Sequence, residues 1–170
     1  MKQDNSSSVK SGGNTYYNMI PAAMFFMNRI TAVGKGIKPM KNFAKKLSLV
    51  FAAGCLGGVL NSLTVWFFGD IGLTSAAGVK LAPALTLPWL YPRIIWGGIW
   101  GLLFLLPMPS DRVFSRGLIL SIGPSLVQLF VIFPMIAHKG IMGMDLGVLT
   151  PVFVLFYNAV WGVAASIWMR

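Results

Sequence analysis

One uncharged stretch decides the fold, residues 47–68, which read LSLVFAAGCLGGVLNSLTVWFF. As an α-helix at about 1.5 Å per residue, its 22 residues would extend about 33 Å. The hydrocarbon core of a bilayer is about 30 Å thick, so this helix is long enough to cross it. The whole chain has the same character, because 56% of its 170 residues are hydrophobic and only 11% are charged. Soluble domains usually carry about a quarter charged residues, so the sequence predicts an integral membrane protein.

Three more apolar stretches follow, at residues 90–106, 117–136 and 148–169. They are apolar all round and do not alternate with polar residues, which favours membrane helices over the strands of a barrel. We therefore predict an all-α fold in which residues 47–170 form a bundle of four transmembrane helices. Residues 71–91 contain Lys80 and are broken by Pro83 and Pro88, and proline removes helix hydrogen bonds. We expect an interfacial or re-entrant hairpin there, on the outer side of the membrane.

Residues 1–46 are expected to form a basic cytoplasmic tail. The Ser, Gly and Asn of residues 1–15 predict disorder. The apolar run from Met19 meets Asn28 and Arg29 after nine residues, which is too short to cross and favours a position on the membrane surface. Five lysines follow within twelve residues and predict attraction to anionic lipid headgroups. Translation from Met40 instead of Met1 is an open alternative.

The distribution of lysine and arginine predicts the orientation of the bundle. With a cytoplasmic N-terminus, the four spans place eleven of the 14 basic residues inside and three outside, namely Lys80, Arg93 and Lys139. Both termini are then cytoplasmic. The net charge of +10 is then explained mainly by the orientation of the protein in the membrane. Nucleic acid is not an expected partner, because no aromatic residues interleave with a basic groove.

Few residues in this chain are suited to catalysis or to metal binding. The chain has no glutamate, one cysteine (Cys55), one histidine (His138) and only four acidic residues. Phosphate-binding loops, nucleophile elbows and zincin helices are not found. We expect no enzymatic activity, no cofactor and no metal. The residues before Cys55 look like a bacterial lipoprotein cleavage box, but the apolar run continues thirteen residues beyond it, which favours an uncleaved helix.

Small residues recur at a four-residue spacing in the first two predicted spans. Gly54 and Gly58 form one such pair, and Gly97 and Gly101 form the other. This spacing leaves a smooth stripe on a helix, which lets two backbones approach closely. We expect these glycines to pack the first two helices together within one chain, with contact between two copies of the chain as the alternative.

Several polar side chains lie within the spans: Asn61, Ser121, Ser125, Gln128 and Asn158. Ser121, Ser125 and Gln128 share one helical face because they follow at i, i+4 and i+7. In lipid this face must look inward. We expect the polar groups to bond between helices, with a wet path through the bundle as the alternative.

Arg93 is the one charged residue inside a proposed span. Near the outer interface it would reach water or pair with a carboxylate, and the predicted topology places Asp70 and Asp145 on that side. We therefore expect a polar cluster of Arg93 with Asp70 or Asp145. An anion or lipid-headgroup site at Arg93 is the alternative.

The last third of the chain resembles the small four-helix bacterial inner-membrane proteins of the YagU type. The resemblance lies in Gly117-Leu118, Gln128-Leu129-Phe130-Val131, Phe133-Pro134, Pro151-Val152-Phe153 and Trp161. It implies a bundle in the bacterial inner membrane and carries over no functional residue.

These observations predict a non-enzymatic multi-pass membrane protein with a role in assembly, scaffolding or envelope maintenance. Its expected partners are the bilayer and either a second copy or another membrane protein. The alternative is a small transporter or channel subunit for a small solute or anion. In that case Arg93, Asn61, Gln128 and Asn158 would line the route.

Overall fold

The computed structural model describes residues 16–108 and 112–170, and this part of the chain is all-helical, with no strand. Contacts divide the chain into two units, Met1–Ala44 and Lys45–Arg170. Helix α1 (Tyr16–Asp70) contributes to both units. Residues 16–44 are helical, whereas the disorder predicted for residues 1–15 lies outside the described residues. Every contact discussed below lies within the second unit.

Three helices are long and apolar enough to cross a membrane: Lys41–Asp70 of α1, Val113–Ile136, and Thr150–Trp168. They contain the predicted spans 47–68, 117–136 and nearly all of 148–169. Helix α1 continues past Cys55 without a break, as an uncleaved helix requires. The coarse prediction, an all-helical fold with helices long and apolar enough to cross a membrane, is therefore confirmed for the described residues.

The stretch between the first two predicted spans forms one helical turn and an extended segment. Helix α2 (Leu73–Ala76) follows a turn at Gly72, whose φ of 76° lies in the left-handed region that glycine adopts readily. The segment after it folds back on this turn, because the Thr74 hydroxyl donates a hydrogen bond to the Leu81 carbonyl at 2.9 Å. The segment ends where α3 begins.

The next helix along the chain, α3, is shorter than the three helices that are long and apolar enough to cross a membrane and is not among them. Helix α3 (Leu87–Gly101) has Pro88 in its first turn, where the missing N–H costs no helix bond. After Gly101 the chain tightens into the 3₁₀-helix η1 (Leu102–Leu105). At about 1.5 and 2.0 Å per residue, the two segments together extend roughly 30 Å.

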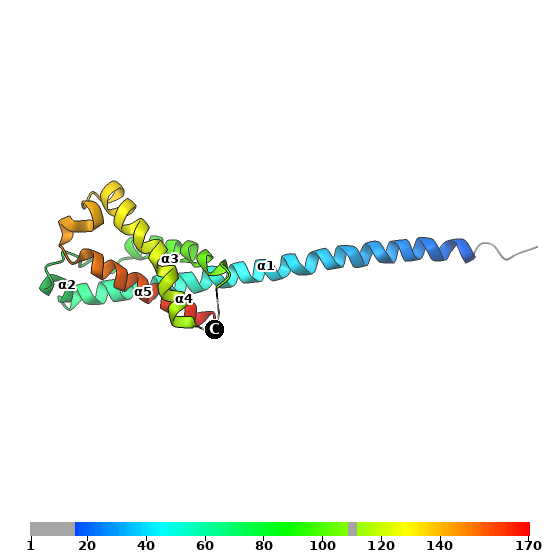
Figure 1. The fold of residues 1–170 in the computed structure, drawn as a ribbon, viewed down its shortest axis with the longest axis horizontal. Helices are drawn as coiled ribbons and strands as arrows, with labels where there is room; N and C mark the ends of the chain where they lie inside the picture. The colour runs from blue at the N-terminus through cyan, green and yellow to red at the C-terminus, as the bar shows by residue number, and fades with distance from the viewer. Residues whose placement is uncertain (1–15, 109–111) are drawn as a thin grey trace, which may run out of the picture. The chain divides into compact units, whose positions relative to one another are not determined.

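Helix α4 (Val113–Val127) continues directly into a π-helix, η2 (Gln128–Ile136). The wider winding is visible at its end, where Ala137 N–H donates to the carbonyl of Ile132, five residues back, at 2.8 Å. The chain stays helical through Pro124, which lies inside α4. A 3₁₀-helix, η3 (Ile141–Leu146), then leads to α5 (Thr150–Trp168) (Figure 1).

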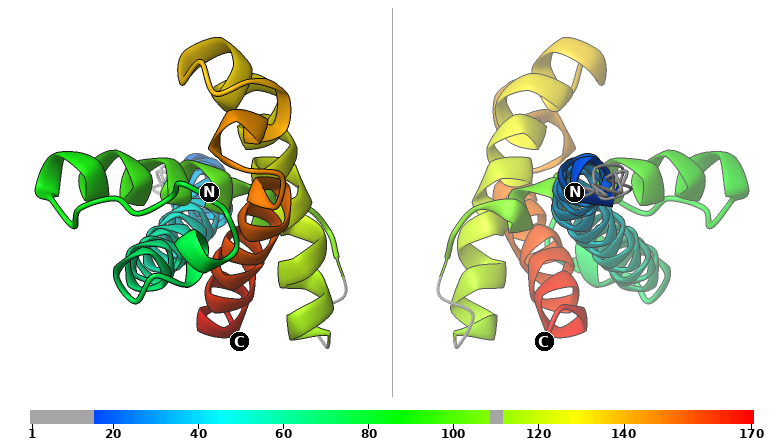
Figure 2. Two further views of the ribbon diagram at one scale, coloured as in Figure 1. Left: turned by 90° about the vertical axis from the view of Figure 1, so that its left-hand side faces the viewer. Right: turned by 90° about the vertical axis from the view of Figure 1, so that its right-hand side faces the viewer.

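Neighbouring helices of the bundle run antiparallel. Gly54 in α1 faces Gly101 of α3, whereas Gly58, one turn later, faces Arg93. Helix α5 also runs against α1, because Trp161 Nε1 donates to the Gly54 carbonyl at 3.0 Å and Asn61 contacts the earlier residues of α5. Figure 2 shows α3 on one side of α1, with α5 and then α4 on the other.

The connecting segments gather at two opposite ends of the bundle. At one end the N–H of Lys80 donates to the Leu146 carbonyl at 2.7 Å, which joins the segment before α3 to the segment before α5. At the other end the guanidinium of Arg116 donates to the Phe104 carbonyl at 2.7 Å. Successive connections therefore alternate between the two ends.

The outer surface of the bundle is apolar. In α4 a stripe of Leu118, Ile122 and Leu126 is 49%, 50% and 51% exposed. Soluble monomers rarely expose contiguous apolar surface of this kind, whereas lipid accepts it. The buried core includes Phe104 and Trp161, whose rings lie 6.0 Å apart.

Candidate functional site

The contact between α1 and α3 is made of glycine against glycine. A Cβ atom on Gly54 would lie 2.8 Å from the Gly101 Cα, and one on Gly97 would lie 2.9 Å from the Gly58 Cα. The structure thus brings the four predicted glycines together within one chain. This close approach brings the backbone of Arg93 against Gly58. The glycine contact therefore determines where the neighbouring polar residues lie along the helix axes.

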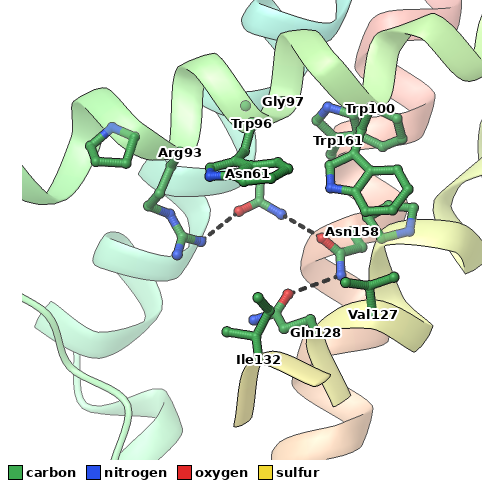
Figure 3. A pocket seen from close by; sticks show the side chains of 13 residues that line it. Asn61, Arg93, Trp96, Gly97, Trp100, Val127, Gln128, Ile132, Asn158 and Trp161 are labelled. Atoms are coloured by element: carbon green, nitrogen blue, oxygen red, sulfur yellow. Dashed lines mark hydrogen bonds between the residues drawn. The ribbon is translucent and has the colours of Figure 1, made fainter. Parts of the chain in front are cut away.

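A chain of hydrogen bonds crosses the bundle beside this glycine contact (Figure 3). The Arg93 guanidinium donates to Asn61 Oδ1 at 2.9 Å and to Ser62 Oγ at 3.0 Å. The Asn61 amide donates to Asn158 Oδ1 at 3.3 Å, and the Asn158 amide donates to Gln128 Oε1 at 3.2 Å. Four helical segments, α3, α1, α5 and η2, each contribute one or more residues to this chain. We call Arg93, Asn61, Asn158 and Gln128 the polar chain.

The predicted pairing of Arg93 with Asp70 or Asp145 is wrong. Of the acidic residues that the structure describes, neither Asp70 nor Asp145 bonds to Arg93, and both are exposed. The reason is register, because α3 begins only at Leu87, so Arg93 lies level with Asn61. Asp70 is nine residues further along α1, roughly 14 Å away at about 1.5 Å per residue.

Two cavities meet at the polar chain, and Asn61, Arg93 and Gln128 line both. The first is a half-open cleft of about 310 Å³ between α3 and α4, which we call the tryptophan cavity. Its walls include Trp96, Trp100, Val127, Ile132 and Trp161. Figure 3 shows the polar chain lying alongside the three indole rings. Apart from the polar chain itself, its walls are apolar or aromatic.

The second cavity, of about 320 Å³, is lined by Lys80 as well as Arg93, and we call it the lysine cavity. Tyr157 also lines it. The Tyr157 side chain is only 3% exposed, and its hydroxyl has no hydrogen-bond partner among the residues described. Arg93 also lies over the ring of Trp89, with its Cζ 4.6 Å from the ring centroid, a cation–π contact. The lysine cavity is thus lined by two cationic residues, Lys80 and Arg93.

The two serines predicted to share the inward face with Gln128 play a different part. Ser121 and Ser125 are buried, but their hydroxyls donate within α4, to the carbonyls of Leu118 and Ser121 at 2.7 Å. They do not join the polar chain. Small residues on this face instead let α4 approach α5, because a Cβ on Gly117 would lie 2.7 Å from the carbonyl carbon of Gly162.

Sequence reasoning missed the Gly117–Gly162 contact, although the small-x-x-x-small spacing of Gly117 with Ser121 and of Gly162 with Ser166 was available as a signal. It also missed Tyr157 and the role of Lys80, for which no local pattern exists.

No cluster of three or more His, Cys, Asp or Glu side chains that could hold a metal ion occurs in the part of the chain that the structure describes. Comparison of the chain with protein-family models, curated proteins and solved structures gives no match.

Proposed function

We propose that this chain is a non-enzymatic, four-span membrane protein that binds a small anion at Arg93, as a small transporter or channel subunit. The observation that carries the proposal is the state of Arg93. Its guanidinium is half-buried, its hydrogen-bond partners are neutral, and it lines both cavities. A buried charge without a counter-charge is costly. An anion bound in either cavity would supply that counter-charge.

The second cation strengthens this proposal. Lys80 lines the lysine cavity with Arg93, and the carboxylates of Asp70 and Asp145 do not line it. Two positive side chains around one cavity raise the local concentration of anions.

Four spans with both termini in the cytoplasm are part of the proposal. The alternation of the connections between two ends supports an even number of crossings. One end carries Arg112, Arg116 and Arg170, and the other carries Lys80 and Lys139, as expected if the first end is cytoplasmic. We further propose the bacterial inner membrane, on the YagU-type resemblance, and binding of anionic headgroups by the basic tail.

A scaffolding role is the second candidate. It is favoured by the amides of Asn61, Asn158 and Gln128, which bond to one another and tie three helical segments together. Such bonds stabilise a bundle without any ligand. This candidate differs from the first in that it assigns no ligand to Arg93.

Thermal unfolding of the purified full chain in neutral detergent separates the two candidates. Phosphate and sulfate should stabilise the wild type, by about 2.7 kcal/mol when present at about 100 times Kd. Arg93→Gln should abolish this stabilisation, and Arg112→Gln, which removes an exposed arginine at the opposite end, should keep it. Equal stabilisation of both variants, or none of the wild type, would exclude the anion site and leave the scaffolding role.

A further inference from the structure

We propose that the ligand of this site is an anionic amphiphile, with its charged head in the lysine cavity and its alkyl chain in the tryptophan cavity. This inference rests on the proposed anion site and names its ligand class. It depends on a contrast between two cavities that share one boundary.

The contrast is chemical. The lysine cavity is lined by two cationic residues, Lys80 and Arg93. The tryptophan cavity offers polar groups only along the polar chain, and its other walls are apolar. A small hydrated anion would use the first cavity and leave the second without a role. A ligand with a charged head and an apolar tail matches both, on the two sides of Arg93.

The sizes of the cavities agree with such a ligand. Small-molecule sites usually measure about 300 to 1,000 Å³. Each cavity alone, at about 310 and 320 Å³, is at the lower limit of that range. Together they provide room for a head and a substantial part of one alkyl chain.

The tryptophan cavity also opens in the direction from which such a ligand would come. Trp96 and Ile132 line it and are 58% and 36% exposed. Both belong to helical segments of the bundle, so their exposed faces would contact lipid. An amphiphile from the bilayer can therefore enter sideways between α3 and η2 without first passing through water.

Tryptophan fluorescence gives a direct test. The probe is an alkyl phosphate with bromine on its chain, because bromine quenches indole fluorescence on contact. Added to the full chain in neutral detergent, it should quench saturably. Replacing Trp96 and Trp100 by Phe should remove most of the saturable quenching, whereas Trp168→Phe, on an exposed face of α5, should not.

Matched variants test the two halves of the ligand. For the tail, Val127→Phe narrows the tryptophan cavity, and Leu126→Phe makes the same change on the 51% exposed neighbour. We expect Val127→Phe to raise the half-saturating probe concentration at least tenfold and Leu126→Phe to leave it within twofold. For the head, Lys80→Gln alters an exposed side chain in a loop and should raise the half-saturating probe concentration several-fold.

The outcomes separate this inference from the anion site itself. One outcome is that phosphate stabilises the wild type through Arg93, but the half-saturating probe concentration is the same for Val127→Phe and Leu126→Phe. In that case the ligand is a small anion and the amphiphile is refuted. If neither phosphate nor the probe depends on Arg93, both proposals fail. Saturable quenching that is weakened by substitution of Arg93, by Lys80→Gln and by Val127→Phe supports the amphiphile.

Discussion

Replacing Gly54 by Ala tests the glycine contact that sets the register of the site. The new Cβ would lie 2.8 Å from the Gly101 Cα and 3.0 Å from its N, and it would also meet the Gly97 carbonyl. All three are backbone atoms, so no side chain can turn away. Restoring an ordinary contact of 3.4 Å to the Gly101 Cα requires α3 to retreat by about 0.6 Å, and the closer Gly97 carbonyl requires a larger shift.

The expected cost follows from two opposing terms. Overpacking of this kind costs about 1 to 3 kcal/mol, whereas Ala favours a helix over Gly by about 1 kcal/mol. We therefore expect Gly54→Ala to lower the free energy of unfolding by up to about 2 kcal/mol. The assay is reversible unfolding in mixed micelles, followed by circular dichroism.

Gly123→Ala is the matched control. It lies in α4 and gains the same helix propensity, but its Cβ would meet only side-chain atoms, with Leu103 Cδ1 at 3.2 Å. A flexible leucine can give way, so we expect unchanged or slightly increased stability. If Gly54→Ala is as stable as Gly123→Ala, α1 and α3 do not approach as closely as described and the argument from register is refuted.

Two further predictions concern the polar chain and the topology. A double-mutant cycle on Arg93 and Asn61 should give a coupling energy of about 0.6 kcal/mol and below about 1.7 kcal/mol, as for other intramembrane hydrogen bonds. The cycle on Arg93 and Asp70 should give no coupling energy, and the reverse ranking would contradict the hydrogen bonds described. For the topology, single cysteines are introduced in a Cys55→Ser background at Ser75 and Ser115, which are exposed at opposite ends of the bundle. An impermeant maleimide should label Ser75→Cys in spheroplasts and Ser115→Cys only after lysis. Labelling of Ser115→Cys without lysis would contradict the proposed orientation.

What could be predicted from the sequence depended on local patterns. The first span needs only its length and its lack of charge, and the glycine stripes need only the spacing of Gly54 with Gly58. Both are properties of a single helix. The pairing of the two stripes follows because each needs a small-residue surface opposite it.

The partners of Arg93 could not be predicted, because they depend on where α3 begins. Proline at three positions between residues 83 and 92 left that start open, and a shift by one turn changes which residues of α1 face Arg93. The π-helical winding of η2 similarly determines which residues after Gln128 face the cavities. The two cavities are formed by α1, α3, α4, η2 and α5 together with the segment before α3, so no single stretch of sequence contains them.

The order of the hydrogen bonds along the chain has a consequence for biosynthesis. Both side chains that accept from Arg93, Asn61 and Ser62, precede it in the sequence and belong to the helix that is made first. When α3 leaves the ribosome, a polar patch and a glycine surface are therefore already available in α1. If α3 crosses the membrane as proposed, the arginine can enter the membrane together with its partners, as part of a two-helix hairpin.

Asn158 belongs to α5 and reaches Asn61 and Gln128 only after α5 has been made. Helix α5 therefore completes the polar chain after the charge has been accommodated. A nascent chain arrested before α5 should retain a stably inserted α1–α3 hairpin, in which the side chains of Asn61 and Gln128 are not yet bonded to Asn158.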